Sequence, residues 1–263
     1  MAVKGRLDKE LVARGLVTSR SQAENYIRLG DVVVDGKVVQ KPGYMVGDQA
    51  LITLSPRERY VSRAGLKLAS VVLALGITFT DRVVLDVGSS TGGFTDYALK
   101  HGAKKVYAVD VGTDQLHPDL RRDSRIELHE KTDIRDFVPD EAPDIVLIDV
   151  SFISLRQILP HLASICKDTT LIVAMVKPQF EAGRDKVGKG GIVRDPATHK
   201  EVLERILNVA SDCGFYLHGL TFSPIKGMEG NIEFLGYFTK VAEGSLDITE
   251  DLIDQVIDQA HQL

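Results

Sequence analysis

Short, nearly uninterrupted apolar runs alternate with helix-like stretches through most of this 263-residue chain. Strands that stay apolar on both sides are typical of a parallel sheet covered on both faces, and their alternation with helices predicts a doubly wound α/β domain. Two later runs, joined by a short loop, predict an antiparallel edge to the same mostly parallel, Rossmann-like sheet. The expected strands are residues 83–87, 106–110, 144–149, 171–176, 215–222 and 232–238, and the expected helices are residues 62–77, 94–101, 155–166 and 196–213.

The start of the chain predicts a small α+β domain. A helix over residues 6–16 and a second helix, capped by Ser19 and stopped by Gly30, precede three β-branched stretches. Asp35-Gly36 between two of these stretches is a typical hairpin turn. We therefore expect two helices packed on a small sheet.

These patterns divide the chain into residues 1–59, 60–245 and 246–263, with a linker at about residues 55–62. The first part carries ten Lys/Arg against seven Asp/Glu. The last part carries five acids and no Lys or Arg, and its apolar spacing predicts an acidic amphipathic helix over residues 247–260 that packs on the rest. Because the net charge is −5, a nucleic acid would have to meet the basic first part.

Neither export nor a membrane span is expected. The N-terminus carries Lys4 and Arg6 with no long apolar stretch behind them, which argues against a secretory signal. The longest apolar runs fall far short of the ~20 residues that cross a bilayer. Cys166 and Cys213 are too few and too far apart for a disulfide framework or a metal site, so we expect reduced thiols, no bound metal and a cytoplasmic location.

The first predicted strand of the larger domain runs directly into a glycine-rich turn and a helix start. The turn contains Gly88, Gly92 and Gly93, and small residues there let a backbone approach a ligand closely. In doubly wound sheets, ligands bind beyond the carboxyl ends of the strands. Ser90 stands where a dinucleotide-binding fingerprint has its second glycine, and the Gly-Lys-Ser/Thr of a phosphate loop is missing. The turn therefore predicts a nucleoside site without a phosphate to cradle, and a dehydrogenase remains an alternative that lacks its fingerprint.

Carboxylates follow several of these strands at the same edge of the sheet. Asp110 ends the second strand, 22 residues after Gly88, where an acid can accept hydrogen bonds from ribose hydroxyls. A cluster of acids suits a cation, and S-adenosylmethionine combines ribose hydroxyls and a sulfonium with no phosphate. We therefore predict S-adenosylmethionine as the cofactor, with ordinary turn glycines and capping aspartates as the alternative. The expected cofactor-binding residues are Asp86, Gly88, Ser90, Gly92, Gly93, Phe94, Asp110, Asp133 and Asp149.

Several stretches carry a family likeness. They are residues 62–67 (S-R-A-G-L-K), 86–94 (D-V-G-S-S-T-G-G-F), 176–181 (V-K-P-Q-F-E), 188–195 (G-K-G-G-I-V-R-D) and 230–234 (G-N-I-E-F). Together they resemble the TlyA/hemolysin A family of ribosomal RNA ribose methyltransferases, which belongs with the FtsJ-like 2′-O-methyltransferases. The first domain resembles the RNA-binding module of ribosomal-protein-S-four type through residues 6–8, 15–16, 19–20, 30 and 34–36.

The resemblance implies a catalytic quartet of Lys67, Asp149, Lys177 and Glu233, each inside its expected motif. It also implies ribosomal RNA as the substrate, with cytidine as the methylated nucleoside. On the residues alone, Lys67 would be an ordinary surface lysine and Glu233 could equally be a solvent-facing strand residue. Asp149 and Lys177, by contrast, follow buried strands at the ligand-binding edge of the sheet.

Methyl transfer to a ribose 2′-hydroxyl requires loss of the hydroxyl proton as the oxygen attacks the methyl carbon. We interpret Lys177 as the base, a role in which the lysine must be neutral. Burial, Lys67 and a bound sulfonium favour the neutral form, whereas Asp149 and Glu233 favour the charged form. In the alternative, Lys177 stays charged and stabilises the developing alkoxide.

Basic residues predict where RNA meets the protein. Cations of the first domain can line one face against phosphates, and such contacts position an RNA without reading its sequence. The glycine-rich basic loop over residues 183–191 predicts a lid over the RNA strand, with a solvated flexible loop as the alternative. The expected RNA-binding residues are Arg6, Lys9, Arg14, Ser19, Arg20, Lys37, Lys41, Arg63 and Lys189. We expect a monomer that binds a large folded RNA, and the family resemblance implies that this partner is ribosomal RNA or a ribosomal subunit.

Two other functions are compatible with parts of the pattern. A membrane-active hemolysin is suggested by the name of the family, but the amphipathic tail is acidic and would be repelled by anionic lipid. A non-catalytic RNA-binding or ribosome assembly factor would not need all four residues of the quartet. The sequence therefore favours an S-adenosylmethionine-dependent RNA ribose 2′-O-methyltransferase.

Overall fold

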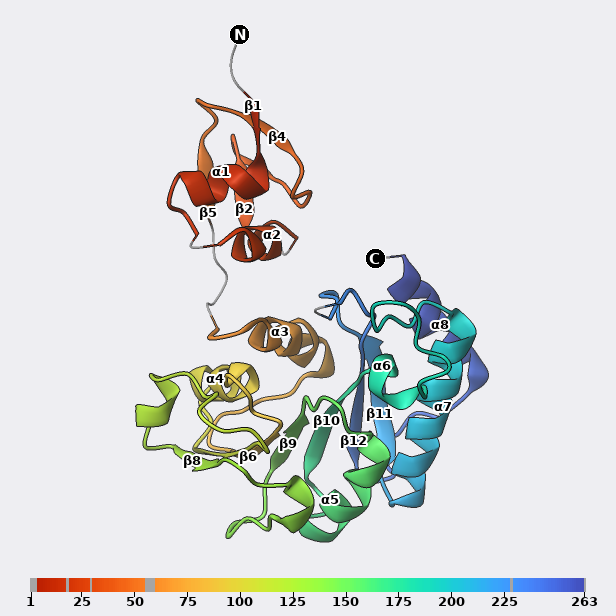
Figure 1. The fold of residues 1–263 in the computed structure, drawn as a ribbon. Coiled ribbons are helices and arrows are strands. Elements are labelled where there is room, and N and C mark those ends of the chain that lie inside the picture. The colour runs from red at the N-terminus through yellow and green to blue at the C-terminus, as the bar shows by residue number, and fades with distance from the viewer. Residues whose placement is uncertain (1–3, 18, 29, 55–59, 228, 263) are drawn as a thin grey trace. The chain divides into compact units, whose positions relative to one another are not determined.

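A computed structural model describes residues 4–17, 19–28, 30–54, 60–227 and 229–262. The chain forms two compact units, Met1–Arg59 and Tyr60–Leu263 (Figure 1). The linker expected at about residues 55–62 falls largely outside the described residues.

The first unit packs two helices against two small antiparallel sheets. Its elements are β1 (Lys4–Arg6), α1 (Leu7–Ala13), α2 (Arg20–Arg28), β2 (Val32–Val34), β3 (Lys37–Val38), β4 (Met45–Gly47) and β5 (Ile52–Leu54). β3, β2 and β5 form one sheet in that order, and β1 pairs with β4. The predicted hairpin is confirmed, because Asp35 and Gly36 have φ angles of 49° and 79°, as a two-residue type I′ turn requires. The core of the unit includes Leu7, Leu11 and Ile27.

The first helix is shorter than the prediction over residues 6–16. It ends at Ala13, and Gly15 follows in the left-handed region with φ 68°, a conformation that terminates helices. Arg6 lies in β1 and pairs with Met45 of β4. This pairing was missed because two three-residue strands carry no alternating apolar pattern and their partners are about 40 residues apart in sequence.

The second unit contains a seven-stranded sheet in the order β11-β12-β10-β9-β6-β7-β8. β10, β9, β6, β7 and β8 are parallel, whereas β12 is antiparallel to β10 and β11 is antiparallel to β12. The predicted doubly wound sheet with an antiparallel edge is therefore confirmed. The strands are β6 (Val83–Val87), β7 (Lys105–Val109), β8 (Ile126–His129), β9 (Ile145–Ile148), β10 (Leu171–Val176), β11 (Tyr216–Phe222) and β12 (Phe234–Thr239). β8 was not expected, because it is a half-buried edge strand without a continuous apolar run.

Each face of this sheet carries its own apolar core, and Figure 1 shows helices on both sides of the sheet. Because side chains alternate along a strand, Val84 of β6 faces the core under α3 and α4, whereas Leu85 and Val87 face the core under α5, α7 and α8. The helices are α3 (Arg63–Leu75), α4 (Gly93–Lys100), α5 (Leu159–Ile165), α6 (Pro178–Glu181), α7 (Pro196–Asp212) and α8 (Glu250–His261). Three short 3-10 helices, Leu120–Arg122, Ile134–Asp136 and Leu155–Gln157, lie in the connections.

The acidic C-terminal helix packs as the apolar spacing predicted. α8 buries Ile253, Val256 and Ile257 in the core that it shares with α7. Lys200 of α7 lies 2.9 Å from Asp254, so one of the acids is balanced within the unit. α8 thus extends the second unit and covers the far end of its sheet.

Candidate functional site

The glycine turn lies at the carboxyl end of β6, in the middle of the sheet. Gly88, Ser90 and Gly92 have φ angles of 82°, 47° and 96°, so the chain turns sharply before α4 begins at Gly93. A Cβ on Gly88 would lie 3.0 Å from the backbone oxygen of Asp149. A larger residue would therefore force this turn away from the end of β9, and glycine keeps the two segments together.

Gly92 and Gly93 are required for a reason other than the expected approach of a ligand. A Cβ on Gly92 would lie 2.7 Å from Cδ1 of Leu116. A Cβ on Gly93 would lie 2.8 Å from both the Ala64 Cβ and the Gly65 backbone nitrogen of α3. Gly93 therefore allows α3 and α4 to pack closely, and this contact fixes where α3 presents Lys67.

Asp86 is almost completely buried, with 1% of its surface exposed. Its Oδ2 accepts a hydrogen bond from Thr95 Oγ1 at 2.6 Å, and its Oδ1 has no hydrogen-bond partner among the described residues. Burial, helped by the charge of Asp149, raises the pKa of Asp86 to about 7, although the Thr95 hydrogen bond opposes the shift. A buried carboxylate with one free oxygen beside a cavity is suited to a cationic ligand.

Asp110 and Asp133 line a second cavity, of about 420 Å³, on the other side of the glycine turn. Asp110 accepts hydrogen bonds from the backbone nitrogens of Ser90 at 2.8 Å and Gly112 at 2.7 Å. Asp133 caps a short 3-10 helix and pairs with Arg135 at 2.6 Å, and this partner lowers the pKa of Asp133 to about 2. Both acids are thus fixed by internal hydrogen bonds at the rim of this cavity.

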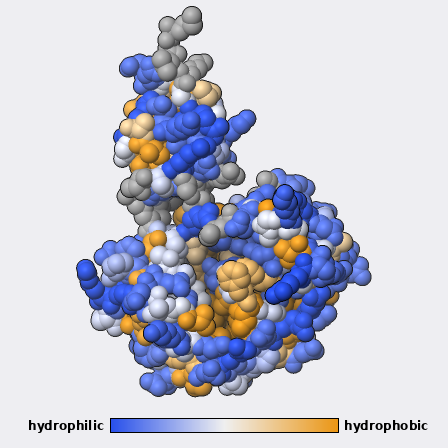
Figure 2. Space-filling model, in the orientation of Figure 1, coloured by the Kyte–Doolittle hydropathy of each residue, from blue (hydrophilic) through white to orange (hydrophobic). Residues whose placement is uncertain are grey.

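The main cavity has a volume of about 590 Å³ and adjoins the second one, because Gly88, Ser90 and Asp149 line both. It opens at the edge of the sheet where the parallel strands end. Figure 2 shows a hollow in the second unit with apolar side chains around it. The two cavities together form one continuous site on both sides of the glycine turn.

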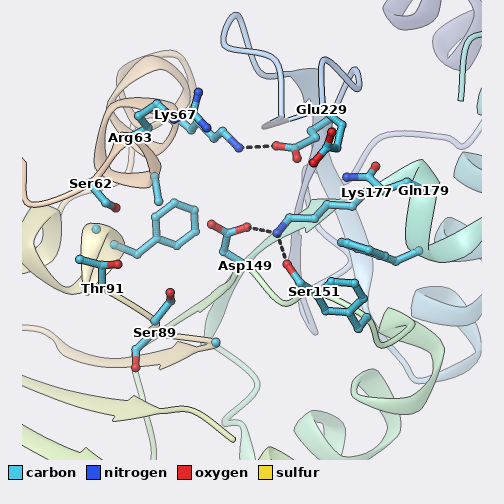
Figure 3. A pocket seen from close by; sticks show the side chains of 18 of the residues that line it. Ser62, Arg63, Lys67, Ser89, Thr91, Asp149, Ser151, Lys177, Gln179 and Glu229 are labelled. Carbon is cyan, nitrogen blue, oxygen red and sulfur yellow. Dashed lines mark hydrogen bonds and ion pairs between the residues drawn. The ribbon is translucent and has the colours of Figure 1, made fainter. Parts of the chain in front are cut away.

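All four residues of the expected quartet line the main cavity, where they form two ion pairs (Figure 3). Lys67 Nζ lies 2.5 Å from Glu233 Oε2, and Lys177 Nζ lies 2.8 Å from Asp149 Oδ1. The second pair is close in distance but is not aligned as a hydrogen bond, whereas Lys177 Nζ donates to Ser151 Oγ at 3.2 Å. Lys67 is 8% exposed and Glu233 is 3% exposed, so neither is the surface residue that its local sequence suggested.

The topology of the sheet explains why distant residues meet here. Asp149 follows β9 and Lys177 follows β10, so both lie at the carboxyl ends of neighbouring parallel strands. β12 runs antiparallel to β10 with Phe234 opposite Val176. Glu233, which precedes β12, is therefore placed at the same edge as Lys177.

The residues around the glycine turn fit S-adenosylmethionine. Asp86 Oδ1 and Ser89 Oγ are buried without a partner among the described residues, so a ligand can provide one. The nearby carboxylates favour a cation. Val111 and Ile134 give the second cavity apolar walls suited to a purine ring, and Phe94 lines the main cavity. All the expected cofactor-binding residues except Gly92 line one of the two adjoining cavities. Gly92 lines neither cavity and packs against apolar side chains.

Sequence reasoning assigned no role to several residues that line the main cavity, among them Ser89, Ser151, Phe152, Gln179, Phe180 and Glu229. Gln179 and Phe180 lie inside the V-K-P-Q-F-E stretch, so that stretch could have indicated them. No sequence signal indicates Phe152, which is 90% exposed with a φ of 64°.

The glycine-rich loop over residues 183–191 contributes Val187, Gly190 and Gly191 to the main cavity. Asn231, which is 1% exposed, ties this loop to β12. Its Nδ2 donates to the Gly191 oxygen at 2.8 Å, and its Oδ1 accepts from the Val193 nitrogen at 2.9 Å. The structure thus connects the loop to the segment that carries Glu233, and closure of the loop over RNA stays a prediction.

In the first unit, two arginines meet one buried acid. Arg6 Nη2 lies 2.9 Å and Arg20 Nε lies 2.8 Å from Asp8 Oδ2. Hydrogen bonding from Arg6 holds the pKa of Asp8 well below its usual range. The side chains of Arg6 and Arg20 are 42% and 53% exposed, so the buried carboxylate orients two guanidinium groups that still reach solvent.

Other expected RNA-binding residues are placed differently. Arg14 turns into the unit, where its guanidinium donates to the backbone oxygens of Ala50 and Gly47 at 2.6 and 3.1 Å. The Ser19 hydroxyl caps α2 by accepting from the Gln22 nitrogen at 3.2 Å. Arg14 therefore serves as an internal brace, and Ser19 confirms its predicted cap. Lys9, Lys37, Lys41 and Lys189 are exposed, and Arg63 lines the main cavity.

Two further findings concern metals and membranes. Across the described ranges, no group of three or more His, Cys, Asp or Glu side chains is arranged to hold a metal ion. No helix in that part of the chain combines the length and apolar character needed to span a bilayer. Both cysteines are free thiols.

Comparison with known proteins agrees with this arrangement. The FtsJ-like methyltransferase family matches residues 60–240, and the S4 domain matches residues 5–52. The chain belongs to the FtsJ-like methyltransferase family. The seven-stranded sheet, the glycine turn and the two adjoining cavities all lie inside the matched region.

Relatives of this family member match over nearly its whole length. The Bacillus subtilis protein YqxC is 44% identical over 98% of this chain and 95% of its own. The Mycobacterium tuberculosis 16S/23S rRNA (cytidine-2′-O)-methyltransferase TlyA is 38% identical over 98% of this chain and 99% of its own. A solved Streptococcus thermophilus protein, described as a candidate hemolysin, has a TM-score of 0.75 and 43% identity, and covers 100% of this chain and 97% of its own. The resemblance to the TlyA/hemolysin A family is therefore confirmed.

Proposed function

We propose that this protein transfers a methyl group from S-adenosylmethionine to the 2′-hydroxyl of a cytidine in ribosomal RNA. The observation that carries the proposal is the pair of lysine–carboxylate contacts, Lys67–Glu233 and Lys177–Asp149, in a cavity beside the glycine turn. The relative named as a 16S/23S rRNA (cytidine-2′-O)-methyltransferase supports the choice of RNA and nucleoside.

When bound, the cofactor supplies an electrophilic methyl group on a sulfonium cation. In this proposal Asp86, Ser89 and Asp110 hold it, and the small residues of the turn leave room for it. Asp86, with a pKa near 7, ionises readily when a cation comes close. These residues therefore bind and orient the cofactor and take no proton from the substrate.

In this proposal Lys177 acts on the 2′-hydroxyl. Its Nζ lies 2.8 Å from Asp149 Oδ1 and donates to Ser151 Oγ in the main cavity. In its neutral form Lys177 takes the hydroxyl proton as the new oxygen–carbon bond forms; in its charged form it stabilises the oxygen as negative charge develops and the proton leaves to solvent. Lys67 and Glu233 form the other ion pair of the cavity, in which each keeps the other from being a buried, uncompensated charge.

The first unit would hold the RNA. Arg6 and Arg20 are oriented by Asp8. Lys9, Lys37 and Lys41 of the same unit are also exposed. Such cations contact phosphates and so position a folded RNA without reading its bases. A tethered RNA-binding unit raises the effective concentration of substrate at the cavity. We place the protein in the cytoplasm with ribosomal subunits as its substrate.

Mapping 2′-O-methyl groups on ribosomal RNA tests this proposal. Ribosomal subunits purified from cells that lack the protein are incubated with the full chain and S-adenosylmethionine, and the RNA is then mapped by resistance of the methylated linkages to alkaline cleavage. A new mark on one or a few cytidines is expected. Subunits that gain no ribose mark, or gain marks only on bases, contradict the proposal.

A further inference from the structure

The half of the main cavity beyond Lys177 has its own chemistry. Figure 3 shows Gln179 and Glu229 on the same side as Lys177, opposite Ser62 and Thr91 beside the glycine turn. This half lies away from the residues that fit the cofactor. It is therefore the part of the cavity in which the acceptor nucleotide has room.

Two aromatic rings line this half. The Phe152 and Phe180 ring centroids are 4.9 Å apart, and Lys177 Nζ lies 5.9 Å from the Phe180 centroid. If Lys177 acts on the 2′-hydroxyl, as the proposed function requires, the base on the adjacent ribose carbon enters beside these rings. The two rings can make apolar contact with a flat nucleobase, but they do not distinguish one base from another.

Two acceptor groups in this half have no partner within the described part of the chain. Gln179 Oε1 is buried and has no hydrogen-bond partner among the described residues. The Glu229 carboxylate lines the same cavity and forms no ion pair within the described part of the chain. The Nζ atoms of Lys67 and Lys177 already lie against Glu233 and Asp149. This half is therefore complementary to a group that donates hydrogen bonds.

We propose that Gln179, supported by Glu229, selects the acceptor base by accepting a hydrogen bond from its exocyclic amino group. The 4-amino group of cytosine donates to Gln179 Oε1, whereas uracil presents an oxygen at that position. With the Gln179 amide oriented as in the structure, a uridine would leave the buried Oε1 unpaired and bring its own oxygen toward the Glu229 carboxylate. Sites that hydrogen-bond a substrate group reject analogues that lack it, because the buried partner then stays unsatisfied. The cavity therefore selects cytidine over uridine by this contact.

The test compares cytidine and uridine at one target position. The methylated position is first mapped with the wild-type protein, and subunits are then prepared with either base at that position. We expect wild-type kcat/KM to favour cytidine by roughly 10- to 100-fold. Gln179→Met, similar in size but unable to accept the bond, lowers kcat/KM for cytidine and leaves uridine nearly unchanged, so the preference largely disappears. Gln255→Met, on the exposed side of α8, is the matched control and keeps the wild-type preference.

Two more variants separate base selection from a merely structural role. Gln179→Glu keeps an acceptor and should keep the preference for cytidine. Glu229→Gln removes the repulsion and should raise kcat/KM for uridine by about tenfold, with a smaller change for cytidine. Because Glu229 is exposed, this variant gives a result even where a change at Gln179 impairs folding.

The inference is overturned if Gln179→Met and Glu229→Gln both still methylate cytidine and both keep the wild-type preference for cytidine over uridine. Failure of the proposed function looks different, because the wild-type protein then places no 2′-O-methyl group on either substrate. Cofactor binding, measured by calorimetry for each variant, shows that the other half of the site is intact.

Discussion

Replacing Asp86 by asparagine should stabilise the protein at neutral pH and weaken cofactor binding. The carboxylate is 1% exposed, and its pKa is raised to about 7 from 3.8, mainly by burial. Between these two values the folded state holds a proton that the unfolded state has lost. The wild-type free energy of unfolding therefore falls as pH rises from about 4 to about 7, and an asparagine has no such dependence.

The size of the effect follows from the shift. One pKa unit corresponds to about 1.36 kcal/mol, so the difference between 3.8 and 7 amounts to about 4 kcal/mol. The amide oxygen of the substituted side chain can still accept the Thr95 hydrogen bond, which measures 2.6 Å in the wild type, but its amide nitrogen would be buried in place of Oδ1. Some of the gain is lost to that unpaired group.

Urea unfolding of both proteins at several pH values measures this effect. The stability of Asp86→Asn relative to wild type should rise by about 1.4 kcal/mol per pH unit between pH 5 and 7 and become constant above. The affinity of the wild-type protein for the cofactor should instead increase as pH rises toward 7. The wild-type Kd for S-adenosylmethionine should rise about tenfold per unit below pH 7, because a bound cation favours the ionised acid, while the variant binds weakly at every pH. A stability difference that does not change with pH would refute the assignment of a raised pKa to Asp86.

Four other substitutions test separate parts of the account. Lys67→Met leaves Glu233 as a buried charge without its partner, so the free energy of unfolding should fall by about 3–5 kcal/mol, and unchanged stability in urea would contradict the pairing. Gly93→Ala puts a Cβ 2.8 Å from α3 and should cost about 1–3 kcal/mol by the same assay. Lys177→Arg distinguishes the two roles of this residue, because a guanidinium keeps the positive charge but cannot act as a base; substantial turnover would favour charge stabilisation. Arg20→Ala should weaken binding to ribosomal RNA and reduce the salt dependence of log Kd by about one unit, and an unchanged slope would remove Arg20 from the RNA surface.

The larger fold could be predicted because its signals are local and strong. The apolar runs of β6, β9 and β10 are nearly continuous, and such runs indicate buried parallel strands on their own. β1, β4 and β8 could not be predicted in the same way. Their positions depend on partners elsewhere in the chain or on half-buried edges, and no periodic pattern marks them.

The site was predictable to the extent that family motifs and strand ends marked it. Asp149 and Lys177 follow buried strands, so their place at the ligand-binding edge follows from the alternation of strands and helices. The burial of Lys67 depends on the contact of α3 with Gly93, which no local pattern reveals. Arg14 looked like the other basic residues of its helix, but its backbone partners lie more than 30 residues away. Long-range packing thus decided which charges were buried and which remained available.

The central claim is that a lysine–carboxylate cluster beside the cofactor carries out ribose methylation. Single-turnover transfer of a labelled methyl group to ribosomal subunits, compared between wild type and Lys177→Ala, tests it most directly. We expect the variant to bind S-adenosylmethionine with nearly the wild-type Kd and to lose transfer by at least about 100-fold. Transfer at the wild-type rate by Lys177→Ala, with the mark on the same 2′-hydroxyl, would contradict it.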